Sequence, residues 1–306
     1  MREAASVIDP VFLRSPQYVC EALSDQLGVR VLLKVETANP IRSFKGRGAE
    51  CFVSGVRAGE RLVCASAGNF GQAMAYSCRK RGIALSVYAG VAANELKISR
   101  IAGMGAQVVI EGEDFDAAKI AGRRAAEREG ARWVEDGFEP AIAEGAGTIG
   151  LELLDSAEPL EAVVVPVGNG ALIGGVGCAM KACRPGVEVI GVQSVGAPAM
   201  VESWRSGRIV THDSMDTIAD GIGVRVPIPE AVEDMRVVMD DALLVEEESI
   251  RWAMRLLHDH AGLVVEPSGA AAIAALLEHA DRFRGRTVAT IICGGNLTAD
   301  QIYRWL

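Results

Sequence analysis

The sequence is poor in the features that mark several large classes of protein. Aromatic residues make up only 5% of its 306 residues, the formal net charge is −9, and no block of clustered Lys and Arg occurs. Binding of nucleic acid or of an anionic membrane surface requires clustered cations. We therefore expect neither a nucleic acid nor a membrane as partner.

Apolar runs and paired metal-binding residues are also scarce. No window approaches the roughly 18 uninterrupted apolar residues of a membrane span, and residues 1–17 lack the apolar core of a signal peptide. The seven cysteines are odd in number and contain no CxxC pair, as is typical of reduced thiols. His258 and His260 are two residues apart and do not share a helix face. We predict a cytoplasmic protein without a bound metal.

Apolar runs rich in β-branched residues alternate with stretches of helical periodicity along most of the chain. This alternation is typical of parallel sheets covered by helices. Asp114 and Gly130 are suited to begin and end one of the helices, and 205–230 is expected to be loop. Strands are predicted at 29–36, 61–66, 84–90, 106–112, 162–168, 187–193 and 287–293, and helices at 70–81, 94–104, 115–129, 173–183, 248–260 and 268–280.

Seven strands are too many for one minimal α/β unit, and residues 51–139 contain a complete set of strands and helices. We therefore predict a small mobile domain, 51–139, inserted into a large domain formed by 1–50 and 140–306.

A glycine-rich turn in VPVGNGALIGGVG (165–177) joins a predicted strand to a helix. Such a turn exposes backbone N–H groups to an anion, and the helix N-terminus adds partial positive charge. A nucleoside-triphosphate loop would require a lysine that is absent here. A dinucleotide fingerprint would require glycine at Ile173 and an acid at Gln193. A single phosphate fits better.

Two further strands end in small polar residues. CASAGNFGQAMAYS (64–77) is a second candidate anion site, in which Asn69 offers an amide N–H₂ group. TIICGGNLT (290–298) brings Cys293 to the carboxyl end of a strand, where open parallel sheets bind ligands.

The stretch IRSFKGRG (41–48) adds a lysine with an aromatic neighbour and two glycines. Pyridoxal phosphate satisfies all of these features, because its phosphate needs a dipole cradle and its aldehyde a Schiff-base lysine. The second anion site would then take the carboxylate of an amino-acid substrate. Phe44 could pack on the cofactor ring, and Gly46 and Gly48 allow the backbone to approach it.

The chain resembles the fold-type II pyridoxal-phosphate enzymes of the threonine/serine dehydratase and serine racemase family. The resemblance covers nearly the whole length, through IRSFKGRGA, ASAGNFGQA, VPVGNGALIGG, IADGI, VEPSGA and CGGN in the family's order. It implies an α/β fold like that of the tryptophan synthase β subunit, with two open, twisted, mostly parallel sheets flanked by helices. A homodimer is expected.

The resemblance also implies roles for individual residues. Lys45 would be the catalytic Schiff-base residue, with Phe44 on the ring, Asn69 at the phenolic oxygen and Cys293 at the pyridine nitrogen. Gly221 and Glu266 would line the cofactor pocket. The phosphate would be held by Gly168, Asn169, Gly170, Ala171 and Leu172, and the substrate carboxylate by Ser66, Ala67, Gly68 and Asn69 with help from Ser43.

Several residues depart from the family pattern. Cys293 replaces the usual serine of SGGN, Asn169 and Ala171 interrupt GGGGL, Phe70 replaces a common histidine, and Arg42 stands where glycine is frequent. The family's optional cation site is not expected, because Gln193 and Ala199 stand where carboxylates occur in members that have it. No regulatory module is expected after the catalytic unit.

The reaction that we predict is elimination of water from a 3-hydroxy-L-amino acid such as threonine or serine, which gives a 2-oxo acid and ammonia. Three alternatives stay open: a β-replacement synthase of the cysteine-synthase type, an amino-acid racemase, and a pyridoxal-phosphate-binding protein without turnover. The sequence does not name the substituent on the β-carbon.

Overall fold

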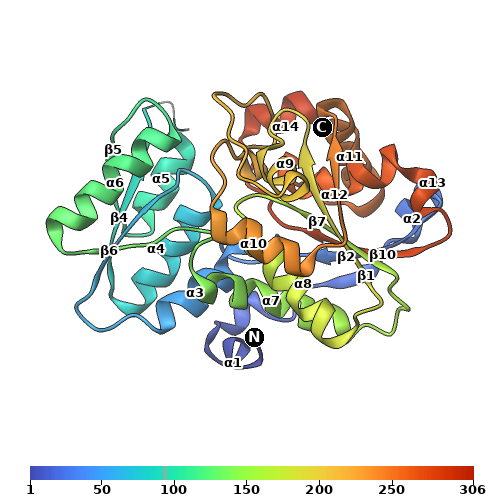
Figure 1. Ribbon diagram of the computed structural model, residues 1–306, viewed down its shortest axis with the longest axis horizontal. Coiled ribbons are helices and arrows are strands. Elements are labelled where there is room, and N and C mark those ends of the chain that lie inside the picture. The colour runs from blue at the N-terminus through green and yellow to red at the C-terminus, as the bar shows by residue number, and fades with distance from the viewer. Residues whose placement is uncertain (92, 94) are drawn as a thin grey trace.

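Two mostly parallel sheets lie side by side in the computed structural model, which describes residues 1–91, 93 and 95–306 (Figure 1). The larger, six-stranded sheet has the order β1-β2-β10-β7-β8-β9. Every neighbouring pair in it is parallel except β1 and β2. Its strands are β1 (Gln17–Val19), β2 (Arg30–Val35), β7 (Ala162–Pro166), β8 (Glu188–Ser194), β9 (Asp241–Val245) and β10 (Thr287–Ile292).

The smaller sheet has four parallel strands in the order β5-β4-β3-β6. All four lie inside the segment 51–139 that was predicted as an inserted domain, whose boundaries and mobility stay predictions. The strands are β3 (Arg61–Ala65), β4 (Ala84–Ala89), β5 (Gln107–Ile110) and β6 (Arg132–Trp133). The prediction of two mostly parallel sheets flanked by helices is confirmed.

Helices cover both faces of each sheet (Figure 1). Asp114 caps the helix that follows it by accepting from the Ala117 amide at 2.9 Å, and Gly130 ends this helix with φ +63°, as predicted. The helices are α1 (Arg2–Val7), α2 (Glu21–Leu27), α3 (Lys45–Ser54), α4 (Asn69–Arg81), α5 (Glu95–Gly103), α6 (Phe115–Glu129), α7 (Pro140–Leu154), α8 (Ala171–Cys183), α9 (Ala199–Ser206), α10 (Pro229–Val238), α11 (Glu247–Ala261), α12 (Pro267–Glu278), α13 (Ala280–Phe283) and α14 (Ala299–Trp305), with short 3₁₀ turns at Pro10–Phe12 and Asp220–Ile222.

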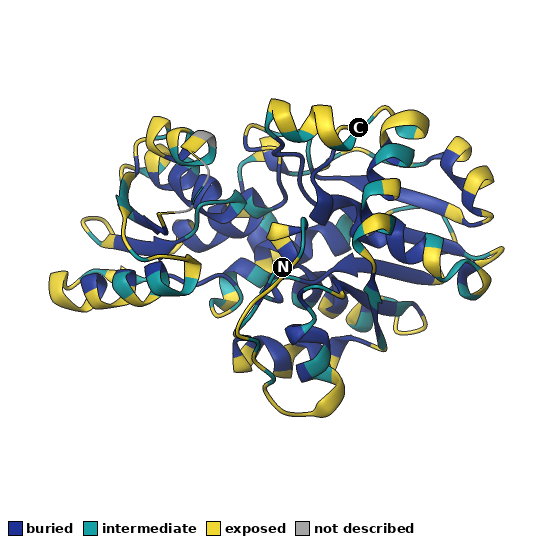
Figure 2. Cartoon of the chain, turned by 90° about the horizontal axis from the view of Figure 1, so that it is seen from above, coloured by how far each residue is buried: buried dark blue, intermediate teal, exposed yellow. Residues whose placement is uncertain are grey.

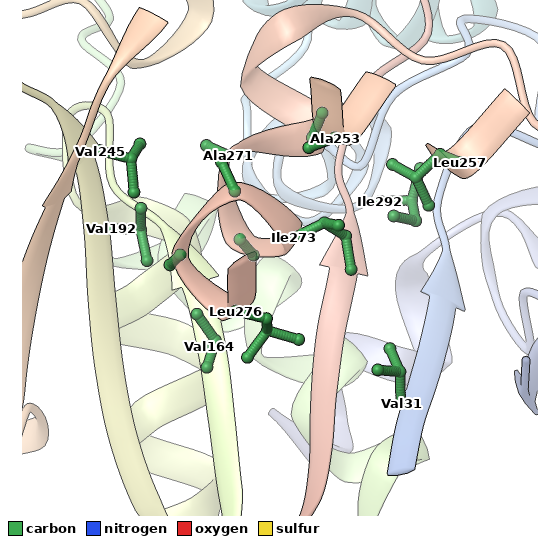
Figure 3. Packing of buried hydrophobic residues seen from close by; sticks show 14 of the residues in the cluster. Val31, Val164, Val192, Val245, Ala253, Leu257, Ala271, Ile273, Leu276 and Ile292 are labelled. Carbon is green, nitrogen blue, oxygen red and sulfur yellow. The ribbon is translucent and has the colours of Figure 1, made fainter. Parts of the chain in front are cut away.

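The larger part, which is built around the six-stranded sheet, has a core on each face of that sheet: one lies against α11 and α12, the other against α7, α8 and α10. Ala271, Ile273 and Leu276 of α12 pack among Val164 and Val192 of the strands, and α11 covers the outer side (Figure 3). Residues 267–276 of α12 are all buried, so this helix is apolar around its circumference. The central strands of the larger sheet are mostly dark in the burial view, whereas exposed residues lie on the outer helices and loops (Figure 2).

Helix α7 joins the two parts and was not anticipated from the sequence. Its glycines permit close contact, because a Cβ at Gly145 would overlap the Arg47 carbonyl oxygen. A Cβ at Gly150 would lie 2.7 Å from the Ala179 Cβ. A helix rich in glycine has low intrinsic propensity, so packing against α3 and α8 stabilises it. Among the described residues, no helix is long and apolar enough to cross a membrane.

Candidate active site

A cavity of about 660 Å³ lies between the two parts, at the carboxyl ends of strands from both sheets. The segments that follow β3, β6, β7 and β10 all contribute to its walls. Most residues predicted for the site line it: Phe44, Lys45, Ser66, Ala67, Gly68, Asn69, Asn169, Gly221, Glu266 and Cys293. Ligands of open parallel sheets bind at this end of the strands.

Lys45 is the first residue of α3 and extends into the cavity, with 13% of its side chain exposed. Its Nζ lies 4.6 Å from the centre of the Phe44 ring and 2.5 Å from Oδ2 of Asp136. Asp136 follows β6 and was not predicted as a site residue. The lysine is therefore held at one position between an aromatic face and a carboxylate.

A buried ionic network fixes the backbone beneath Lys45. Arg47, with no exposed side-chain surface, donates to Glu36 at 2.8 Å and to Glu152 at 2.6 Å. Lys34 donates to the same Glu152 at 2.5 Å. Ser43 is also buried; its hydroxyl donates to the Cys293 carbonyl at 3.2 Å and accepts from the Lys45 amide at 3.3 Å. Ser43 thus supports the start of α3 and is not among the residues that line the cavity.

The glycine-rich loop after β7 is the predicted anion cradle, and its backbone geometry is suited to that role. Gly170 has φ +95°, which favours glycine, and caps α8. A Cβ at Gly168 would lie 2.8 Å from the Gly221 carbonyl oxygen, so the two loops touch through backbone atoms. The first N–H groups of α8 have no acceptor within the helix and are available to an anion. Only Asn169 of this loop lines the cavity wall; Gly170, Ala171 and Leu172 are buried beneath it.

The loop after β3 holds Asn69 in a defined orientation. Its Nδ2 donates to Glu266 at 2.6 Å, and its Oδ1 accepts from Asn296 at 2.8 Å. The second hydrogen of Nδ2 stays available for a ligand oxygen. The Ser66 hydroxyl accepts from the Gly68 amide at 3.1 Å and so closes a turn within its own loop. This loop provides an amide donor that neighbouring residues hold in place.

Burial raises the pKa of Glu266 to about 7, and the negative charge of Asp220 acts in the same direction. A folded-state pKa above the usual 4.5 means that the native protein binds this proton more tightly than the unfolded chain. The stabilising contribution is then complete at pH values below about 4.5 and is lost as the pH rises toward about 7.

Replacement of Glu266 by Gln should therefore remove a pH-dependent part of the stability. We expect the variant to lose up to about 3 kcal/mol of the variation in unfolding free energy between pH 4.5 and 7. Denaturant titrations at several pH values would measure this difference, with exposed Glu248→Gln as the control. An unchanged pH profile in Glu266→Gln would contradict the assignment.

Cys293 follows β10 and lies at the cavity wall with its side chain buried. Burial raises the pKa of its thiol well above the ordinary range, and the negative charge of Glu266 adds to this effect. A raised pKa keeps this group a neutral thiol at physiological pH. A neutral thiol is a weak hydrogen-bond donor.

Because serine is also a neutral group of similar size, Cys293→Ser should keep turnover within about tenfold of the parent protein. Steady-state rates and the cofactor absorbance would be measured, with buried Cys64→Ser as the control. A loss of many orders of magnitude would show that the thiol has a different role.

The structure also reveals charged pairs across the cavity that the sequence did not indicate. Arg225 of the larger part contacts Asp116 and lies 2.9 Å from Asp114, both of the smaller part. Lys97 of the smaller part lies 2.5 Å from Asp220 of the larger part. These residues are far apart in the sequence, and no local pattern marks them. They connect the two walls of the cavity.

Fold and site together define an α/β protein whose cavity places the Lys45 amine between a glycine-rich loop and a second polar loop. Pyridoxal phosphate fits these residues on structural grounds. Its phosphate matches the free N–H groups of the loop before α8, its aldehyde matches Lys45, and its phenolic oxygen matches the remaining Asn69 hydrogen.

Comparison with known proteins agrees with this class. The family described as pyridoxal-phosphate dependent enzyme matches residues 8–294, and the chain belongs to this family. It is 37% identical to the L-threonine ammonia-lyase of Thermotoga maritima over 99% of this chain and 76% of that protein. The processed form of threonine deaminase isoform 2 from Solanum lycopersicum superposes with a TM-score of 0.93 at 29% identity, over 99% of this chain and 90% of that one. Maize serine racemase gives a TM-score of 0.92 at 26% identity, over 99% of this chain and 94% of that one.

These findings confirm the predicted family, its cofactor and the enzymatic class. The roles of the individual site residues stay predictions, supported by their position around the cavity. Among the described residues, no group of three or more His, Cys, Asp or Glu is arranged to hold a metal ion.

Proposed function

We propose that this protein eliminates water from a 3-hydroxy-L-amino acid and releases a 2-oxo acid and ammonia. The observation that carries the proposal is the position of the Lys45 amine in a cavity with an anion cradle on one side and the loop of residues 66–69 on the other. When bound, pyridoxal phosphate supplies an electron-withdrawing ring that stabilises negative charge on Cα of the amino acid.

The residues of the chain bind the substrate, remove a proton and limit the access of water. The loop of residues 66–69 binds the substrate carboxylate and so orients Cα toward Lys45. The freed Lys45 amine takes the Cα proton, for which it must be neutral and within hydrogen-bond reach. Phe44 and the ion pairs across the cavity limit the access of water.

Release of 2-oxo acid and ammonia from L-threonine and L-serine tests the proposal directly. Equal yields of the two products, without any added nucleophile, are expected. O-acetylserine with sulfide is the comparison for the synthase alternative. Faster formation of cysteine than of 2-oxo acid would favour that alternative, and no product from any substrate would favour a protein without turnover.

The enzyme should racemise its substrates poorly. Racemisation requires an acid–base group on each face of Cα. In serine racemases of this family, a serine directly before the Gly-Asn pair serves the face opposite the lysine; here that residue is Ala67. The Ser66 hydroxyl is engaged by the Gly68 amide, and Asp136 contacts Lys45 Nζ itself and so lies on the side of the lysine.

We expect D-serine to form from L-serine at less than about one hundredth of the rate of pyruvate formation. Chiral chromatography would measure it, and comparable rates would refute the expectation. Ala67→Ser should increase racemisation, whereas Ala65→Ser, at the end of β3, is the matched control.

Three further expectations accompany this proposal. We propose that 51–139 moves as a small domain relative to 1–50 and 140–306, that two copies form a homodimer, and that the protein acts in the cytoplasm. The acidic net charge of −9 and the predominance of reduced thiols expected from the sequence support the last of these.

A further inference from the structure

We infer that Asp136 determines which β-substituents the site accepts: it binds a neutral or cationic hydrogen-bond donor and excludes a second carboxylate on the substrate. The inference rests on the proposed function, since it names the substrate class of the same site. It concerns a residue that neither the sequence motifs nor the proposed chemistry uses.

The carboxylate of Asp136 faces the reacting position. Its Oδ2 lies 2.5 Å from Lys45 Nζ, and its side chain is only 9% exposed. Its Oδ1 is buried and has no hydrogen-bond partner in the protein. A buried carboxylate without a partner is costly, so it favours a substrate that brings a donor.

The backbone around Asp136 holds the carboxylate in place. Gly137 has φ +91°, and a Cβ there would overlap the Asn169 carbonyl oxygen. The segment after β6 is therefore pressed against the glycine-rich loop through backbone atoms. Its other acid, Glu135, contacts Lys119, Arg123 and Trp133 instead.

Cations in the cavity are already engaged by carboxylates of its own walls. Apart from Lys45, the cationic residues that line it within the described part of the chain are Lys97, Lys119 and Arg225. Lys97 lies 2.5 Å from Asp220, Lys119 contacts Glu135, and Arg225 contacts Asp114 and Asp116. A second substrate carboxylate would have to break one of these pairs to find a partner.

The position of the β-substituent follows from the other subsites. The loop of residues 66–69 would hold the substrate carboxylate, and the loop before α8 would hold the cofactor phosphate. Lys45 Nζ must lie within hydrogen-bond reach of the proton on Cα. Asp136 is in direct contact with that nitrogen. Its carboxylate therefore lies close to the substrate's β-carbon, which is bonded to Cα.

Like charges this close in a site screened from water repel strongly. A 3-hydroxyaspartate would place its second carboxylate beside Asp136, whereas serine or threonine places a hydroxyl there. The inference therefore excludes 3-hydroxyaspartate as a substrate and keeps serine and threonine.

Equilibrium binding of two unreactive isosteres gives a first test that does not depend on turnover. In the holoenzyme, L-asparagine should bind at least about tenfold more tightly than L-aspartate, measured through the cofactor absorbance. Asp136→Asn should shift the ratio of the two affinities toward aspartate by about tenfold or more, and Asp136→Ala should shift it in the same direction. Asp213→Asn is the matched control, because this exposed residue lines the cavity rim and the substitution makes the same change of charge.

The ratio of kcat/KM for L-serine to that for L-threo-3-hydroxyaspartate gives the second test. It should fall by about tenfold or more in Asp136→Asn, because one substrate loses a partner and the other loses a repulsion. Equal effects on both substrates would overturn the inference and leave Asp136 as a residue that merely holds Lys45. If the parent protein releases 2-oxo acid from neither substrate, the proposed function fails instead. The ratio of the asparagine and aspartate affinities then still tests whether Asp136 excludes a second carboxylate.

Discussion

Replacement of Lys45 by Ala should abolish both the yellow colour of the purified protein and its turnover. The parent protein should absorb above about 400 nm, as expected when the lysine amine forms a conjugated bond with the cofactor. Lys45 is also the proposed base for the Cα proton, and proton transfer alone contributes roughly 10²–10⁴-fold to such reactions. With the covalent contribution added, we expect a loss of at least about 10⁴-fold in kcat.

A second cavity lysine provides the matched control for this experiment. Lys119 lines the same cavity but contacts Glu135. Lys119→Ala should keep the absorbance band and most of the turnover. Spectra and 2-oxo-acid release would be measured for both variants after dialysis against the cofactor. A Lys45→Ala protein that retained both properties would show that another residue forms the Schiff base.

Replacement of Arg47 by Met should have the largest effect on stability. The Arg47 side chain has no exposed surface and contacts two carboxylates, one of which, Glu36, is also completely buried. Burial opposes the charge on Arg47, yet Glu36 and Glu152 raise its pKa above the ordinary value. Removal of the arginine would leave Glu36 as a buried, uncompensated charge, which costs about 3–5 kcal/mol.

Denaturant unfolding at neutral pH would measure the loss, with Arg251→Met as the control because the Arg251–Glu248 pair is more exposed. The double variant with Glu36→Gln should be less destabilised than Arg47→Met alone, since the unpaired charge is then removed. A loss below about 1 kcal/mol in Arg47→Met would contradict this account. If turnover is also lost in Arg47→Met, we expect the cause to be a displacement of Lys45, which begins the same helix.

Sequence patterns predicted the elements that depend on interactions between residues close together in the chain. The helix after Asp114 begins and ends at the predicted residues because a side-chain cap and a left-handed glycine act within a few residues of their own position. The central strands were predicted because strands buried on both faces are continuous apolar runs. Strands β1 and β6 were missed because, with 3 and 2 residues, they carry no periodic signal. The five-residue strand β9 was also missed.

Other features have causes that act only between distant segments. Arg42 stands where the family often has glycine, and its φ of +52° gives the reason: the backbone there is left-handed. Its carbonyl accepts from the Gly295 amide at 3.0 Å, a contact that no local pattern reveals. Helix α7 likewise depends on close packing through its glycines and has little intrinsic preference to form.

The sequence alone determined the family and the cofactor and predicted Lys45 as the Schiff-base residue. The motifs of a cofactor site are short, and the chemical requirement of each is met by neighbouring residues. Only the tertiary structure placed Asp136 against Lys45 and joined Arg225 to Asp114 and Asp116. Asp136 is 91 residues from Lys45, and Arg225 is 111 residues from Asp114. Electrostatic contacts depend on distance in space, so these contacts become visible only when the two sheets are set side by side.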